Sequence, residues 1–189
     1  VFEEKEDRRA GDRLLMDRFG YAKTVDTSVY ERNREAADNE NKYVVRCLNT
    51  EDLLITDGGK MHQVKVPDLP YGKFRDKGTP IDNVSNYSSA EEQIVMVCDA
   101  EQMRFAKLLF ATKQGMIKRV EGTEFQVAKR TIAATKLQEE DALIGVWVVN
   151  EIQHAVLQTK NGYFLRSRPR TSGKEERRGR RTGNPAAEK

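Results

Sequence analysis

FATKQGMIKRV at residues 110–120 and LQTKNGYFLRS at residues 157–167 share one layout: a Thr, a Gly three residues later, and basic residues just beyond. MDRFGYAKTV at 16–25 and ITDGGKMHQV at 55–64 superpose on both without gaps. In each copy an apolar run precedes a polar turn that ends in Gly, and a second alternating run follows. A tight turn that needs positive φ takes Gly at the least cost, so the four copies predict four β-hairpins.

The connectors between the hairpins repeat as well. Residues 73–101 and 124–152 each contain a Phe near the start, then a basic loop, a short apolar strand, an acidic turn and a final apolar strand. One repeat therefore has about four strands in roughly 50 residues, and we call this unit a blade. Blades of this kind predict an all-β, radially repeated protein.

Two further segments complete the fold prediction. Residues 28–42, SVYERNREAADNENK, interrupt the first repeat with good helix formers but no apolar stripe. They predict a short exposed helix or a charged insertion. The strand pattern with a period of two predicts that Phe74 and Phe125, at matching sites, pack in the blade cores together with Val146, Trp147 and Val148.

Composition limits the class of protein. The chain has 189 residues, of which 38% are hydrophobic and 33% charged, so it should fold while keeping a highly charged surface. It has no run of roughly 18 apolar residues and no signal-peptide layout at its start. We expect a soluble cytoplasmic segment of a longer protein.

Cysteine and histidine give no sign of a metal or redox site. Cys47 and Cys98 lie in apolar runs without a metal-binding neighbour, and are interpreted as reduced core thiols. His62 and His154 are too isolated for a zinc site or a catalytic dyad, and are interpreted as surface or strand positions. No metal and no cofactor is expected.

Three regions are predicted along the chain. Residues 1–13 are a linker from an upstream domain, residues 14–166 hold the blades, and residues 167–189 are a disordered basic tail. The hairpins are expected near 14–25, 53–66, 107–120 and 155–166. Residues 166–181 carry eight basic residues against two acidic ones, without an apolar run. Two interpretations of the tail stay open, a genuine basic arm that adds non-specific DNA affinity and the product of a truncated or shifted reading frame.

Several long motifs resemble the C-terminal domain of the A subunit of bacterial type IIA topoisomerases, meaning DNA gyrase and topoisomerase IV. They are LLFATKQGMIKRVEGTEF, KRTIAATKLQEEDALIGVWVV, DRFGYAKTVD, GKMHQVKVPDLPYGKFRDKGTPIDN and LQTKNGYFLR, and together they span about residues 14–166. The resemblance implies a β-pinwheel, a propeller-like disc of four-stranded blades that exchange strands with their neighbours. Because a complete domain of this family has five or six blades, this chain, with about three to four, is expected to be incomplete.

The resemblance also implies a function and partners. The basic outer rim of the disc would bend double-stranded DNA in the cytoplasm of a bacterium, near its nucleoid. Its protein partners would be the ATPase B subunit together with the remainder of the A subunit. The parent enzyme would be an ATP-dependent type II topoisomerase. Gyrase carries a Q-R-R-G-G-K-G signature, which neither YGKFRDKGTP nor FQVAKRTIAA matches. This mismatch favours the topoisomerase IV type or an unclassified A subunit.

Basic residues are the candidates for DNA contact, because a surface that holds DNA without reading its sequence needs cations at regular intervals. They follow the hairpin glycines or lie in the connector loops. The candidates are Lys23, Lys60, Lys65, Lys73, Arg75, Lys77, Lys118, Arg119, Lys129, Arg130, Lys136 and Arg166. Recurrence in the same loop of two blades favours Arg75, Lys77, Lys129 and Arg130. Alternatively, such cations only protect strand edges and keep the chain soluble.

The sequence predicts no catalytic residue. None of the six Tyr residues follows an Arg, as the cleaving Tyr of the parent family does, and no phosphate-binding loop is present. The acids at Asp57, Asp76, Asp82 and Asp99 sit in turns, where capping is the commoner role. We therefore expect a non-catalytic module that captures double-stranded DNA and bends or wraps it. The alternative is a propeller-like scaffold that binds another protein.

Overall fold

Four β-hairpins form at the four repeated glycines in the computed structural model, which describes residues 12–48, 51–149 and 155–167. The hairpins are β1 (Arg13–Asp17) with β2 (Tyr21–Val25), β4 (Glu51–Thr56) with β5 (Lys60–Lys65), β8 (Lys107–Thr112) with β9 (Ile117–Glu121), and β12 (Ala155–Gln158) with β13 (Phe164–Ser167). The turn glycines Gly20, Gly59, Gly115 and Gly162 all have φ between 75° and 83°. Each donates its amide to the carbonyl three residues earlier, at 2.9–3.2 Å. The positive φ expected from the sequence is confirmed.

The remaining strands complete sheets around these hairpins. They are β3 (Asn41–Arg46), β6 (Thr79–Pro80), β7 (Ile94–Asp99), β10 (Thr131–Ala133) and β11 (Leu143–Val149). Sheet 1 has the order β3-β1-β2-β6, sheet 2 β7-β4-β5-β10, sheet 3 β11-β8-β9 and sheet 4 β12-β13. Strands β6 and β10 each belong to the repeat after the sheet that they join, so neighbouring blades exchange strands. The predicted all-β pinwheel is confirmed, and within the described ranges sheets 3 and 4 are incomplete.

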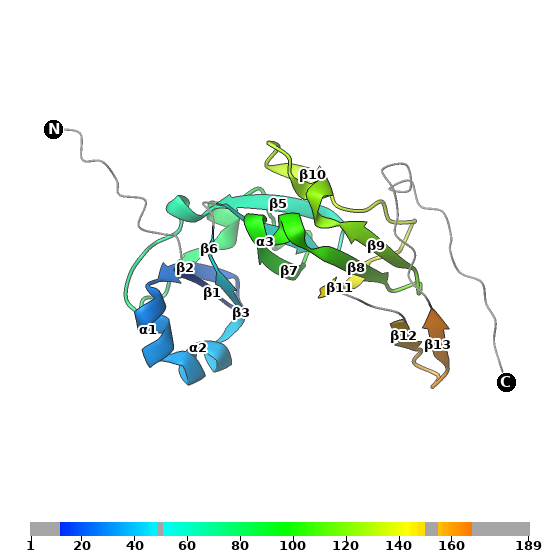
Figure 1. Cartoon of the computed structure of the whole chain (residues 1–189), viewed down its shortest axis with the longest axis horizontal. Helices are drawn as coiled ribbons and strands as arrows, with labels where there is room; N and C mark the ends of the chain where they lie inside the picture. Colours follow the sequence, from blue (N-terminus) through cyan, green and yellow to red (C-terminus); the bar gives the residue numbers. More distant parts are fainter. Residues whose placement is uncertain (1–11, 49–50, 150–154, 168–189) are drawn as a thin grey trace.

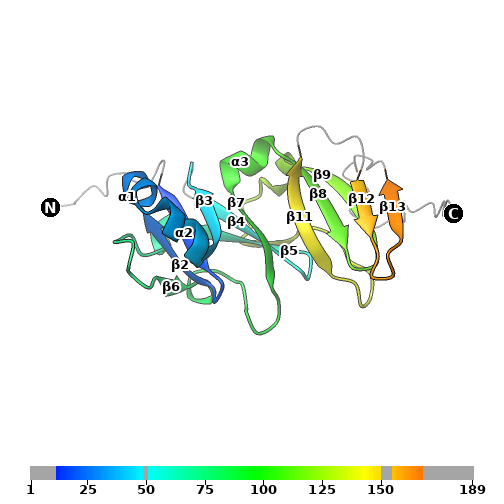
Figure 2. The ribbon, with the colours of Figure 1, turned by 90° about the horizontal axis from the view of Figure 1, so that it is seen from below.

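The sheets follow one another in an arc, with two helices at one end and the β12–β13 hairpin at the other (Figures 1 and 2). Buried apolar side chains fill the space between successive layers. Leu14 and Met16 of sheet 1 pack with Leu54 of sheet 2, and the next cluster joins Met61 of sheet 2 to Phe110 of sheet 3. Each blade core is therefore shared between two neighbouring blades.

Short helices lie in the crossovers and connectors. They are α1 (Thr27–Arg32), α2 (Arg34–Glu40), α3 (Ala100–Phe105) and the 3-10 turns η1 (Val66–Asp68), η2 (Ile81–Asn83) and η3 (Gly122–Phe125). The expectation for residues 28–42 was correct about helix and wrong about burial. Tyr30 and Ala37 are buried against Leu15 and Val25, on the face of sheet 1 that is turned away from sheet 2.

Two predictions about the core are wrong. Trp147 and Val148 are 49% and 51% exposed, whereas Phe125 and Val146 are buried as expected. Both exposed residues lie on β11, the edge strand of sheet 3, and the Trp147 ring covers the position of a Cβ on Gly145, within 2.5 Å.

Phe74 and Phe125 do not occupy matching sites. Thr79 lies opposite Ala22 in sheet 1, and Ile132 lies opposite Met61 in sheet 2, two residues after the hairpin Gly in both sheets. Thr79 and Ile132 are therefore equivalent in the two repeats, and counting back five residues from each makes Phe74 the counterpart of Val127. Phe74 is accordingly half-buried beside the helices, while Phe125 lies in the cluster between sheets 2 and 3.

A buried acidic pair lies between the first two sheets. Asp52 on β4 is opposite Asp99 on β7, and both are 0% exposed. The Cys47 thiol donates to Asp52 Oδ2 at 3.5 Å, and the amide of Leu48 donates to Asp99 Oδ2 at 2.8 Å. Burial raises the pKa of Asp52 to about 7, and the nearby charge of Asp99 makes a smaller contribution in the same direction. Burial also raises the pKa of the Cys98 thiol to about 12. Both cysteines are free and buried, as predicted.

The acidic pair should make stability depend on pH. The pKa of Asp52 is about 7 in the folded chain against 3.8 for an ordinary Asp, so the folded state binds more protons between these values. Stability from this group is therefore full below about pH 4 and is lost as the pH rises through about 7. At roughly 1.4 kcal/mol per pKa unit, and with two units between pH 5 and the folded pKa, we expect Asp52→Asn to gain about 3 kcal/mol over the parent between pH 5 and pH 8. Urea unfolding at several pH values measures this gain, and parallel stability curves for the two proteins would contradict it.

Candidate nucleic-acid interface

The array has an inner and an outer edge. Strand β3 packs against β7, and β7 against β11, so these three strands form the inner edge. The exchanged strands β6 and β10 lie at the opposite end of their sheets, on the convex side of the arc (Figure 1). The loops that lead into them, residues 73–77 and residues 126–130, are called the first and the second rim loop. The basic connector residues predicted from the sequence therefore lie at the outer edge.

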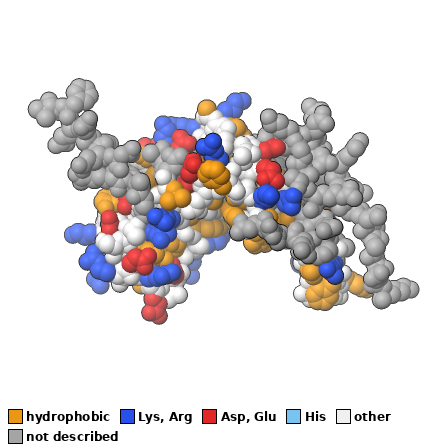
Figure 3. Space-filling view, in the orientation of Figure 1, with side chains coloured by type: hydrophobic (Ala, Val, Ile, Leu, Met, Phe, Trp, Pro, Cys, Tyr) orange, Lys and Arg blue, Asp and Glu red, His pale blue; other side chains and the backbone are white. Residues whose placement is uncertain are grey.

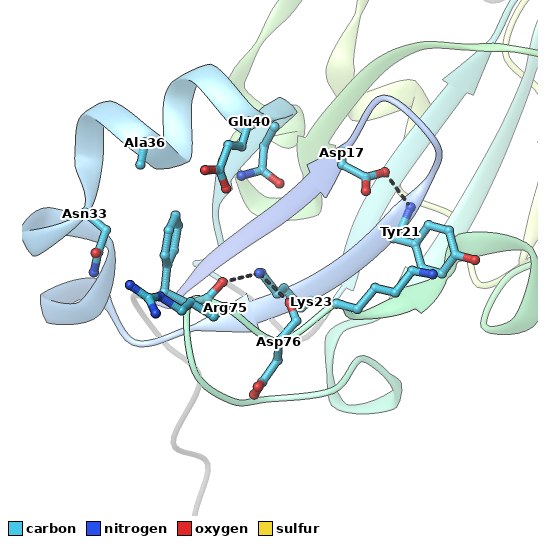
Figure 4. Close-up of a pocket in the computed structure, with 11 residues that line it drawn as sticks. Asp17, Tyr21, Lys23, Asn33, Ala36, Glu40, Arg75 and Asp76 are labelled. Atoms are coloured by element: carbon cyan, nitrogen blue, oxygen red, sulfur yellow. Dashed lines mark hydrogen bonds between the residues drawn. The ribbon is translucent and has the colours of Figure 1, made fainter.

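The first rim loop presents three exposed cations, Lys73, Arg75 and Lys77. Asp76 Oδ2 accepts the Lys73 amide at 2.8 Å, and the Lys77 ammonium lies 4.5 Å from the centroid of the Tyr21 ring. The first bond closes a turn within the loop, and the second contact holds the end of the loop against β2. Figure 4 shows this part of the loop, with Arg75 and Asp76 labelled.

Lys23 lies beneath this loop and differs from its neighbours. Its ammonium donates to the Phe74 carbonyl and, at 2.6 Å, to the Asp76 carbonyl. It also lies 5.3 Å from the centroid of the Phe74 ring. Burial lowers the pKa of Lys23, and the charge of Asp76 opposes that effect. The ammonium is therefore partly buried and is directed at the backbone of the loop.

A pocket of about 510 Å³ opens between the first rim loop and α2 (Figure 4). Three cations and three anions line it: Lys23, Arg75, Lys77, Asp17, Glu40 and Asp76. With charges of both signs in equal number, the pocket offers no single charge to a cofactor. Among the residues that the structure describes, no cluster of His, Cys, Asp and Glu could hold a metal ion.

The turn acids do cap, as expected. The Asp99 carboxylate accepts the amides of Glu101 and Gln102 at the start of α3. Asp57 Oδ1 accepts the Gln93 amide at 2.9 Å. Asp76 and Asp82 accept amides in the same way within their own loops.

The second rim loop repeats the arrangement in sheet 2. Lys129 and Arg130 are exposed, and Lys136 is exposed beyond β10. The Gln63 amide donates to the Arg130 carbonyl at 2.8 Å, and Gln63 Nε2 donates to the Val127 carbonyl at 2.6 Å. The Gln63 side chain on β5 therefore holds this loop against the edge of sheet 2.

Strand register shows which rim cations are equivalent. Counted from the strand pairs that fix the repeat, Lys77 matches Arg130, whereas Arg75 matches Ala128 and Lys129 matches Asp76. The recurrence inferred from the sequence therefore holds for one cation per blade, on an exposed residue one or two positions before the exchanged strand.

The other candidates are spread over the hairpins. Lys60 is exposed, with its Nζ 3.8 Å from Glu92 Oε1, and Lys65 and Arg166 are exposed at strand ends. Lys118 and Arg119 are half-buried on β9, the last strand of sheet 3 in the described part of the chain. Figure 3 shows the Lys and Arg side chains in several groups among acidic ones, rather than in one continuous patch.

A buried polar bridge in sheet 2 was not predicted from the sequence. His62 is on a strand, as one interpretation had it, but it is buried and not at the surface. Its Nε2 lies 2.8 Å from Glu92 Oε1, and its Nδ1 lies 3.1 Å from Thr131 Oγ1 on the exchanged strand. The partners are 30 and 69 residues away in the chain, so no local pattern could reveal them. His154 lies outside the described residues.

Comparison with known proteins gives consistent matches. A family described as "DNA gyrase C-terminal domain, beta-propeller" matches residues 106–150. The DNA gyrase A protein of Lawsonia intracellularis is 31% identical over 166 residues, and that of Deinococcus deserti is 35% identical over 166 residues. Each alignment covers 81% of this chain and 20% of the relative, so the chain spans about a fifth of their length.

The fold also has solved counterparts. The C-terminal domain of DNA topoisomerase IV superposes with a TM-score of 0.66 at 22% identity, over 82% of this chain and 50% of that one. In the ranges 12–48, 51–149 and 155–167, no helix is long and apolar enough to cross a membrane.

Proposed function

We propose that this chain, which belongs to the family of DNA gyrase A C-terminal domains, binds double-stranded DNA along the outer edge of its blades and bends it. The observation that carries the proposal is the pair Lys77 and Arg130. Strand exchange places these exposed cations at the same outer position of two successive blades. Cations repeated at a blade interval suit a phosphate backbone, which also repeats and needs no base contact.

Bending follows from the curvature of the edge. A duplex that touches the rim loops of successive blades must follow the arc of the sheets. Bending a site of 20–30 base pairs costs on the order of 1–6 kcal/mol, which several phosphate contacts can offset. The chain would act without chemistry of its own, in the cytoplasm, beside the ATPase B subunit of a type II topoisomerase together with the remainder of the A subunit. Without the Q-R-R-G-G-K-G signature, bending is proposed and a chiral wrap is not.

Salt dependence tests this function. We expect the full chain to bind a labelled random-sequence duplex of several tens of base pairs. Its log affinity should fall with log salt at about −0.9 per phosphate contact, so the slope should correspond to several contacts. Energy transfer between dyes at the two duplex ends should rise on binding, because bending brings the ends together.

A tail variant is the control for generic polycation binding. Replacing the basic residues of 168–181 by Gln should leave most of the slope and the bending signal. A flat salt dependence would support the alternative of a protein-binding scaffold. Loss of all binding in the tail variant would contradict a role for the blades.

A further inference from the structure

We propose that Lys23 is a positioning residue that clamps the first rim loop, with Gln63 as its counterpart at the second, and that neither contacts DNA. The proposal rests on the proposed function, because the loops matter only if DNA lies along the outer edge. It reassigns a residue that the sequence pattern placed among the phosphate contacts.

Lys23 binds the backbone of the first rim loop at two points. One ammonium donates to two carbonyls of the loop, Phe74 and Asp76, and lies against the Phe74 ring (Figure 4). Hydrogen bonds from a charged donor are roughly twice as strong as neutral ones. To reach a phosphate, the side chain would have to give up these contacts, whereas the exposed Lys77 would give up only a contact with Tyr21.

In sheet 2 a neutral side chain, Gln63, makes the equivalent contact with the rim loop. Gln63 Nε2 donates to the Val127 carbonyl, and strand register makes Val127 the counterpart of Phe74. Lys23 lies three residues after the hairpin Gly and Gln63 four, yet both side chains end on the equivalent carbonyl. Because the recurring feature is a donor aimed at this carbonyl, and the charge does not recur, the shared role is to hold the loop.

The environment of Lys23 agrees with this role. Burial lowers the pKa of its ammonium, which is the cost of placing a cation beneath the loop. Asp76 and Glu40 lie near enough to favour its charged form. These groups keep the cation where it is, and they would repel a phosphate that approached it.

Three variants of the full chain separate clamp from contact: Lys23→Met, Lys23→Gln and, as the matched surface change, Lys77→Met. Lys77→Met should make the salt slope shallower by about 0.9, since it removes a phosphate contact. Lys23→Met should weaken binding about fivefold at every salt concentration, with an unchanged slope, because the loop must then be ordered on binding. Lys23→Gln keeps a donor without the charge and should recover most of that loss.

Hydrogen exchange without DNA gives a second readout. Backbone amides of residues 73–77 should exchange faster in Lys23→Met than in the parent, and close to the parent rate in Lys23→Gln. If both Lys23 variants instead lower the slope by about 0.9 and leave exchange unchanged, Lys23 is a phosphate contact and the proposal is wrong. If the parent chain fails to bind DNA, the proposed function fails, while the exchange rates still decide whether Lys23 clamps the loop.

Discussion

Replacing Arg75, Lys77, Lys129 and Arg130 together by Gln should weaken DNA binding on the order of 100-fold at low salt. The slope of log affinity against log salt should become shallower by about 3.6, which is about 0.9 for each of four lost phosphate contacts. All four side chains are exposed on the rim loops, so their replacement leaves the buried clusters intact. Fluorescence anisotropy with a labelled duplex at five or more salt concentrations gives both quantities.

The matched control removes the same charge elsewhere. Four exposed cations lie on the end helices and on the inner-edge strand β3: Arg32, Arg34, Lys42 and Arg46. Their joint replacement by Gln should change affinity less than about threefold and leave the slope close to that of the parent, because long-range effects of surface charge are screened by salt. Equal losses in the two variants would show that net charge, and not the outer edge, holds the DNA.

How far the sequence predicts the fold depends on the distance over which each signal acts. The hairpins follow from the local pattern of apolar runs around Gly20 and its three repeats, where positive φ is a property of the turn itself. The helices at residues 28–42 were predicted, but their burial was not, because this segment has no apolar stripe. The contacts that bury Tyr30 and Ala37 depend on the free face of sheet 1, which only the assembled array reveals.

In the two rim loops, too, the sequence predicts the location of the cations better than the equivalence of single residues. The sequence placed the basic connector residues in equivalent loops, which is correct for Lys77 and Arg130. The prediction aligned the two loops at Phe74 and Phe125. This alignment is wrong, because the segment between β5 and β6 (66–78) is longer than the segment between β9 and β10 (122–130). Strand register, not the nearest similar residue, sets the equivalence. Lys23 was likewise predicted to be an outward cation, because the carbonyl that it binds lies 51 residues away in the chain.

Gly122→Ala should destabilise the chain by about 4 kcal/mol or more, or prevent it from folding. A Cβ at this position would lie 1.6 Å from the Met103 carbonyl oxygen and 2.8 Å from that of Ala106. Both atoms belong to backbone at the end of α3, and the Gly122 amide itself donates to the Ala106 carbonyl at 2.8 Å. Room for a methyl group therefore requires α3 to move away from η3.

That movement would open the cluster between sheets 2 and 3, because Met103 of α3 and Phe125 of η3 are both buried in it. The second rim loop starts directly after η3, so we expect DNA affinity to fall together with stability. Gly115→Ala is the matched control: its φ is +83° but a Cβ there meets nothing within 4 Å, so it should cost only about 1 kcal/mol. Urea unfolding of the two variants compares the losses. A loss for Gly122→Ala no larger than that for Gly115→Ala would mean that α3 can shift without disturbing the joint between the blades.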